Sequence, residues 1–100
     1  MSGVVVTNNR DLHRYEARLD GTLAGFAEYR LSERVIAFTH TNVDSAFAGR
    51  GLGGALARSA LDDVRAENTR RVQPVCEFIR AWIDKHPDYA DLLASEAASG

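Results

Sequence analysis

Cysteine and proline are scarce in this chain of 100 residues, which holds one Cys and two Pro. With Cys76 as the only thiol, an intramolecular disulfide and a cysteine-cluster metal site are both excluded, since each needs more than one cysteine. The sequence therefore predicts no metal site, and a lone thiol suits a reducing compartment, so we expect a cytoplasmic protein. Long apolar runs are also missing. The longest, such as residues 35–38, are far too short to cross a bilayer, and no export signal or membrane partner is expected.

An excess of positive charge is absent as well. Twelve Lys and Arg stand against fourteen Asp and Glu, for a net charge of −2. A dedicated nucleic-acid binder needs a basic face to neutralise phosphates, so no nucleic-acid partner is expected. The composition, 45% hydrophobic and 26% charged, is that of an ordinary globular chain, and the length fits one unit. We predict a single domain over residues 1–100, with an ordered core at about 4–93.

The first forty residues have the pattern of β-strands. Branched and aromatic residues recur in segments 4–8, 14–19 and 23–31, and Asp20-Gly21 is a typical hairpin turn. These segments predict an antiparallel meander. The next one, residues 34–41, has a continuous apolar centre, which is typical of a strand covered on both faces. We expect it to be the central strand of the sheet.

Helical periodicity begins after the loop that follows this strand. A helix over about residues 51–67 would have one apolar side, and a last strand is expected at 71–75. Phe78 and Trp82 then lie on the apolar side of a final helix that Pro87 would stop, and both are expected in the core. A short helical turn is expected at 89–93. The order predicts an α+β fold: a mixed, mostly antiparallel sheet with a βαβ crossover and a C-terminal helix.

Residues 48–54, Ala-Gly-Arg-Gly-Leu-Gly-Gly, are the most informative stretch. Glycines before a helix let the backbone approach a ligand closely, and free N–H groups at the helix start can bind an anion such as pyrophosphate. The alternative is that the glycines only shape a loop and let the helix pack closely. A P-loop is excluded because Ala55-Leu56 follow where Lys and a hydroxyl residue are required. A dinucleotide fold is disfavoured because a long loop precedes the turn and little chain follows it.

Four short stretches in order resemble the GNAT superfamily of acyl-CoA-dependent N-acyltransferases, especially its small single-domain members. They are His-Thr-Asn-Val at 40–43, Gly-Arg-Gly-Leu-Gly at 49–53, Pro-Val-Cys at 74–76 and His-Pro-Asp-Tyr at 86–89. The resemblance implies a GNAT-like fold and acetyl-CoA as donor, with its pyrophosphate on the turn at 49–54. The cofactor-binding residues it implies are Val43, Ala48, Gly49, Arg50, Gly51, Leu52, Gly53 and Gly54.

Two positions depart from the pattern of that superfamily. Ala48 stands where Gln or Arg is usual, and Asn42 stands where the small members usually carry an acid. The first departure matters less, because phosphate binding in such turns depends chiefly on backbone N–H groups and Arg50 is close by. The second removes a candidate general base, since a neutral amide does not take up a proton near pH 7.

Cys76 and His40 are the candidate catalytic residues. Cys76 is expected at the start of the final helix, beside the thioester that the resemblance implies; the alternative is a buried cysteine acting as a small hydrophobe. Strand alternation places His40 on the same face as Ile36 and Phe38, where it could accept a proton from an amine or activate Cys76. Its alternative role is a histidine satisfied by backbone hydrogen bonds.

The other two histidines are not assigned to the site. His86 precedes Pro87 at a helix end, where a cationic side chain suits the helix dipole, so we expect a structural role. His13 has no partner pattern, and three histidines this far apart match no metal motif.

The sequence thus predicts a minimal acetyl-CoA-dependent N-acetyltransferase acting on an amine acceptor that the sequence does not identify. Direct transfer, with Cys76 lining the site, is favoured over a covalent acetyl-cysteine route because it needs only a positioned amine and a proton acceptor. The alternatives are a non-catalytic CoA or acyl-CoA binding module, and an interaction domain whose glycines serve packing alone. Neither the acceptor nor the oligomeric state follows from the sequence.

Overall fold

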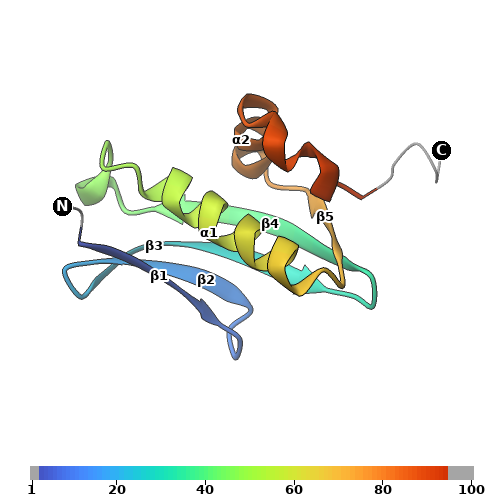
Figure 1. Ribbon diagram of the computed structural model, residues 1–100. Helices are drawn as coiled ribbons and strands as arrows, with labels where there is room; N and C mark the ends of the chain where they lie inside the picture. Colours follow the sequence, from blue (N-terminus) through green and yellow to red (C-terminus); the bar gives the residue numbers. More distant parts are fainter. Residues whose placement is uncertain (1–2, 95–100) are drawn as a thin grey trace.

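A computed structural model describes residues 3–94 as a five-stranded sheet with two α-helices packed on one face (Figure 1). The strands are β1 (Val4–Asn9), β2 (Arg14–Leu19), β3 (Thr22–Leu31), β4 (Val35–Val43) and β5 (Arg71–Pro74). The helices are α1 (Leu52–Glu67) and α2 (Glu77–Lys85), with 3-10 turns η1 (Ser45–Phe47) and η2 (Pro87–Leu92). β1 to β4 are antiparallel neighbours, and β4 pairs with β5 in parallel. The predicted α+β class, with its crossover through α1 and its C-terminal helix, is confirmed.

The hairpin between β2 and β3 turns where the sequence predicts it. Asp20 and Gly21 have φ angles of +52° and +86°. Positive φ at both central positions is what a two-residue hairpin needs to match the twist of its strands, and Asp-Gly accepts that conformation readily. The local chemistry of two residues therefore fixes the register of β2 against β3 next to the turn, and an irregularity between Ala17 and Arg18 shifts it by one residue further along.

The prediction that residues 34–41 form the central strand is wrong. The sheet order is β1-β2-β3-β4-β5, so β3 lies at the centre and β4 lies fourth. Only one face of β4 is fully buried: Ile36 and Phe38 are inside, whereas Val35 and Ala37 are half-exposed. The apolar run indicated a strand correctly, but it carries no information about how many helices will cover that strand.

A β-bulge interrupts β4. Glu28 of β3 faces His40, whereas the next residue, Tyr29, faces Phe38. Thr39 is therefore an extra residue with no partner in the register. An extra residue reverses the alternation of side chains beyond it, because a strand exposes successive residues on opposite faces.

The bulge overturns the predicted orientation of His40. Thr41, which faces the buried Ala27, lies on the helix side of the sheet with Phe38. His40 lies on the opposite face and is exposed. It therefore does not share the face of Ile36 and Phe38, as uninterrupted alternation required.

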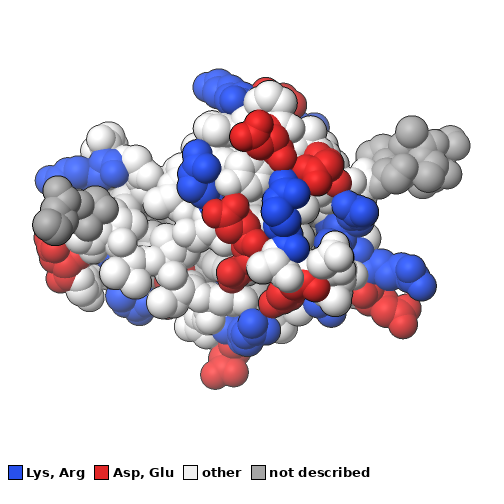
Figure 2. All heavy atoms as spheres, in the orientation of Figure 1, with Lys and Arg blue, Asp and Glu red and all other residues white. Residues whose placement is uncertain are grey.

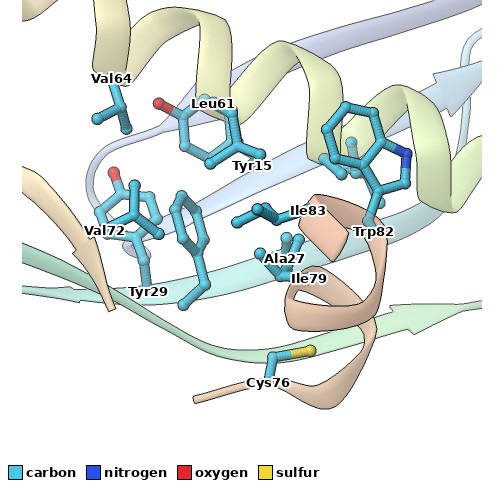
Figure 3. Packing of buried hydrophobic residues seen from close by; sticks show 14 of the residues in the cluster. Tyr15, Ala27, Tyr29, Leu61, Val64, Val72, Cys76, Ile79, Trp82 and Ile83 are labelled. Atoms are coloured by element: carbon cyan, nitrogen blue, oxygen red, sulfur yellow. The ribbon is translucent and has the colours of Figure 1, made fainter. Parts of the chain in front are cut away.

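The core forms between α1, α2 and the side of the sheet that they cover (Figure 3). The buried residues of α1 are those of the predicted apolar side: Leu52, Leu56, Ala57, Ala60, Leu61 and Val64. Trp82 is buried as predicted, and His86 stacks on it with ring centroids 3.8 Å apart while its Nδ1 lies 2.7 Å from the Trp82 carbonyl oxygen. That geometry agrees with a structural role for His86.

Phe78 is not a core residue, contrary to the prediction, since its side chain is 42% exposed. The first turn of α2 lies beside the first turn of α1, and the Phe78 ring packs against Gly53 of α1 rather than between α2 and the sheet. Periodicity identified the apolar side of α2 but not which residues of that side meet the sheet.

The other face of the sheet is covered by none of the helices in residues 3–94; we call it the helix-free face. Glu16 on this face is nonetheless 4% exposed, because Arg14, Arg18 and Asn9 donate to its carboxylate at 2.8, 2.9 and 3.1 Å. Its other side chains include Phe26, Glu28, His40 and Asn42. On the face shown in Figure 2, acidic and basic side chains are interspersed rather than gathered by sign. None of the helices between residues 3 and 94 has the length and apolarity to span a membrane.

Candidate functional site

β4 and β5 separate half way along β4. Their parallel pairing runs from Val35 opposite Arg71 to Phe38 opposite Pro74, and a last hydrogen bond joins the Cys76 N–H to the Phe38 carbonyl at 2.8 Å. Proline has no N–H to continue a ladder, so Pro74 is a natural end to the pairing. Beyond this point, within the described chain, β4 continues with no strand on its β5 side. We call this opening the β4–β5 gap; its free backbone groups can bond an extended ligand.

Cys76 lies at the start of the β4–β5 gap. It is the N-cap residue of α2, its side chain does not cap the helix, and it is 9% exposed. Its thiol instead donates to the hydroxyl of Thr41, with Sγ and Oγ1 3.2 Å apart. Figure 3 shows Cys76 at the first turn of α2, next to β4. Thr41 was not predicted as a site residue, and no signal in the sequence could have found it, because the bulge that turns it toward Cys76 has no sequence mark.

His40 lies next to Thr41 in the chain but on the other face. Its ring centroid is 6.3 Å from that of Phe26, and it faces Glu28 across the β3–β4 ladder. The two predicted catalytic residues are therefore not hydrogen-bonded to each other: the Cys76 thiol bonds Thr41, and His40 is separated from it by the sheet. Glu28 is the second residue that sequence reasoning missed, since its position beside His40 depends on the register.

Backbone conformation and packing each require glycine in the turn at residues 49–54. Gly49 and Gly51 have φ angles of +82° and +74°, and a Cβ at either would meet nothing within 4 Å, so conformation requires glycine there. At Gly53 the reason is packing, because a Cβ would lie 2.6 Å from Cζ of Phe78. A Cβ at Gly54 would lie 3.5 Å from Nε1 of the Trp82 indole, which is an ordinary contact.

The start of α1 points free donors out of the turn. Ala55 N donates to Gly51 O at 3.0 Å as the first helical bond, so the N–H groups of Leu52, Gly53 and Gly54 precede any helical acceptor. No acidic residue lies in this first turn. The positive end of a 16-residue helix with free N–H groups suits an anion.

The remaining predicted cofactor residues surround this helix start. Arg50 is exposed, and the Leu52 side chain is buried and anchors the helix to the core. Val43 ends β4 and packs partly against the core. The Ala48 N–H already donates to Ser45 O at 3.2 Å, so Ala48 does not offer a free donor.

A second hollow lies at the far end of α1. It has a volume of about 40 Å³ and is lined in part by Tyr15, Tyr29 and Val64. Both tyrosine hydroxyls are bonded, Tyr15 to Asp63 at 3.1 Å and Tyr29 to Asn8 at 2.6 Å. This space suits a water molecule rather than a coenzyme. Over residues 3–94, no three His, Cys, Asp or Glu side chains gather in a way that could hold a metal ion.

A sheet split beside a glycine turn and a helix start is an arrangement suited to holding a ligand in an α+β domain, and comparison with known proteins gives the family. The family model described as GCN5-related N-acetyl-transferase matches residues 14–92. The chain therefore belongs to the GCN5-related N-acetyltransferase family. This confirms the family that the sequence motifs resembled.

Relatives and solved structures agree with that assignment. Protein NATD1 of Bos taurus is 31% identical over 85 residues, covering 82% of this chain and 74% of its own; the Mus musculus protein is 29% identical, covering 82% and 76%. The solution structure of a GCN5-like protein from Staphylococcus aureus has a TM-score of 0.70 at 21% identity, covering 94% of this chain and 91% of that one. A ribosomal-protein-alanine N-acetyltransferase from Brucella melitensis has a TM-score of 0.58 at 20% identity, covering 82% and 61%. These two structures support the fold.

Proposed function

We propose that this protein is an acetyl-CoA-dependent N-acetyltransferase that binds its donor in the β4–β5 gap. The observation that carries the proposal is the position of the gap: it opens beside the free N–H groups of α1, with Cys76 and Thr41 where the strands separate. The pyrophosphate would sit on the turn at residues 49–54 and the pantetheine arm along the unpaired side of β4. Its thioester would then lie next to the pair formed by Cys76 and Thr41.

The chemistry needed at this place is modest. The nitrogen lone pair of the acceptor attacks the thioester carbonyl carbon, the C–S bond breaks, and the CoA sulfur leaves with the electron pair and takes up the proton that the nitrogen sheds after attack. The proton that the acceptor ammonium loses before attack can pass to a ring nitrogen of His40. His40 is exposed on the helix-free face beside the β4–β5 gap, so an amine that reaches it from solvent would meet the thioester through the gap, where no described strand flanks β4. Positioning of the two substrates supplies most of the rate.

The second candidate is a CoA or acyl-CoA binding module without catalysis. Asn42 favours it, because an amide takes the place on β4 where the family resemblance implies an acid. The two candidates share the donor site and differ in acceptor chemistry. Release of free CoA that depends on an added amine distinguishes them.

Binding is tested first by calorimetry with CoA and acetyl-CoA. At about 1 mM ligand even a binding free energy near −4 kcal/mol produces measurable heat, and its absence removes the proposal. Gly51→Val should abolish the heat, because a side chain at this φ distorts the turn. Gly21→Val is the matched control: Gly21 also has positive φ and open space, but it lies in the β2–β3 hairpin. If both variants bind like the wild type, the turn is not the site.

Catalysis is tested by chromatographic measurement of CoA released from acetyl-CoA with and without a panel of primary amines. Release that rises with amine concentration and falls in His40→Gln supports the enzyme. CoA binding without release for any amine supports the binding module instead.

A further inference from the structure

We propose that Glu28 binds the ammonium group of the acceptor on the helix-free face and delivers it to His40. The inference rests on the proposed function, which it extends by naming the residue of this chain that would hold the acceptor, a primary alkyl amine that is cationic at neutral pH. No sequence motif points to Glu28. Its role follows from the register of β3 against β4.

The geometry places the carboxylate beside the proton acceptor. Glu28 and His40 face each other directly across the antiparallel ladder, where the Cβ atoms of such pairs lie roughly 5 Å apart. The next pair on the same face is Phe26 and Asn42. The Thr39 bulge is what turns His40 onto this face, and it does so beside the β4–β5 gap.

The charges on this face leave Glu28 available. Arg14 faces Glu28 across the β2–β3 ladder, but its Nε donates to Glu16 at 2.8 Å and its guanidinium lies 4.7 Å from the Phe26 ring centroid. Glu16 is enclosed by that bond and those from Arg18 and Asn9. Between residues 3 and 94, no Lys, Arg or His nitrogen lies within 4.0 Å of the Glu28 carboxylate. Glu28 is half-exposed, so solutes can reach it.

Acceptor chemistry requires such a group. An alkyl amine carries a proton at neutral pH and attacks only after losing it. A carboxylate attracts the ammonium, and the neighbouring imidazole takes one N–H proton, leaving a neutral amine with a free lone pair. Asn42 offers no charge for the first of these steps. Glu28 is therefore an ammonium-binding residue and His40 the proton acceptor.

Binding is measured without any reaction, by nuclear magnetic resonance on isotopically labelled protein saturated with CoA. Butylammonium at pH 7 is the probe, and 1-butanol is the neutral probe of the same shape. Shifts are expected at Phe26, Glu28 and His40 with butylammonium but not with butanol, and at least fivefold weaker affinity is expected in Glu28→Gln. Raising the salt to about 1 M, where the screening length is about 3 Å, should weaken binding in the wild type.

Glu33→Gln is the matched control, because Glu33 lies in the exposed turn between β3 and β4. It should bind like the wild type. Equal shifts with both probes, or unchanged affinity in Glu28→Gln, overturns the proposal. Both readouts are independent of turnover, so they separate failure of this inference from failure of the proposed catalysis.

Activity measurements add a second test, in which the carboxylate is moved to a neighbouring position on the same face. In a protein that releases CoA with an amine, Glu28→Gln should lower kcat/KM about tenfold, mainly through KM, because ground-state binding is lost. Asn42→Glu in the Glu28→Gln background returns a carboxylate to the same face one register step away. Recovery of at least a third of the lost kcat/KM supports an ammonium site, and loss through kcat alone with no recovery contradicts it.

Discussion

The thiol of Cys76 and the hydroxyl of Thr41 lie 3.2 Å apart at the point where β4 and β5 separate. A nucleophilic cysteine needs a base within hydrogen-bond reach. Here the partner of the thiol is a neutral hydroxyl, and His40, the base that the sequence analysis considered for activating the thiol, lies on the other face of the sheet. The arrangement favours a thiol that lines the site over one that carries the acetyl group.

We predict that Cys76→Ala keeps most of its amine-dependent turnover. Direct transfer does not pass through the sulfur, so removing it changes only the packing beside the thioester. Intact-protein mass spectrometry after mixing with acetyl-CoA alone should show no hydroxylamine-labile acetyl adduct. An adduct on the wild type, together with loss of turnover in both Cys76→Ala and Cys76→Ser, would establish the covalent route.

Replacement by alanine should change stability differently at the neighbouring residues Gly53 and Gly54. Gly54→Ala should stabilise the protein by about 0.5 kcal/mol, since alanine loses less backbone entropy in a helix and its Cβ fits beside Trp82. Gly53→Ala should lose that gain, because its Cβ meets the Phe78 ring. Thermal unfolding resolves the difference, as about 1 kcal/mol shifts Tm by about 4–8 °C in a domain of this size. Adding Phe78→Leu should restore the gain at Gly53, and equal effects at both glycines would contradict the packing explanation.

Glu16 makes stability depend on acid pH. Burial alone would raise the pKa of Glu16, but hydrogen bonds from Arg14, Arg18 and Asn9 outweigh it and hold that pKa below 4.5, its usual value. A carboxyl group with a lowered folded pKa adds stability above its unfolded pKa and loses it as pH falls through the folded pKa. Glu16→Gln should therefore be less stable by about 1–3 kcal/mol at pH 7.

Urea denaturation at pH 7 and at pH 3 checks this effect. The gap in free energy of unfolding between wild type and Glu16→Gln should narrow as the pH falls below 4.5, with Glu33→Gln as the control for an exposed carboxylate. If the difference in free energy of unfolding stays constant from pH 7 to pH 3, the lower stability of Glu16→Gln comes from the shape of the side chain rather than from its charge.

Tyr89 attaches η2 to α1. Its hydroxyl donates to Asp62 at 2.8 Å and accepts from Arg58 at 3.2 Å, and its ring packs at 5.0 Å from that of Trp82. Tyr89→Phe keeps the ring and loses both bonds, so we predict a cost of about 1 kcal/mol. A double-mutant cycle with Asp62→Asn measures the part due to that pair. A coupling energy of zero would show that the hydrogen bond between Tyr89 and Asp62 contributes nothing to stability.

Local chemistry made much of the fold predictable. The Asp20-Gly21 turn, the apolar side of α1 and the stop at Pro87 each depend on residues close together in sequence. The family motifs added the identity of the family and the expected donor. Their structural consequences match because turn conformation, helix periodicity and the missing N–H of proline act over a few residues.

The features that the sequence did not predict depend on contacts between segments that are distant in the chain. The bulge at Thr39 arises from how β3 and β4 align, and threonine is an ordinary strand residue, so alternation assigned His40 to the wrong face. For the same reason the roles of Thr41 and Glu28 were missed. Phe78 was predicted in the core because periodicity describes one helix by itself and not which of its residues a neighbouring element covers.

Successive side chains of a strand point to opposite faces of the sheet, and the extra residue Thr39 reverses this alternation once along β4. Ile36 and Phe38, before the bulge, are held in the core, whereas His40 and Asn42, beyond it, are exposed on the helix-free face. Point substitutions alter one side chain at a time. If Thr39 instead paired as an ordinary ladder residue, His40 and Thr41 would exchange faces in one step, so the bulge, more than any single side chain in β4, decides which residues meet which substrate.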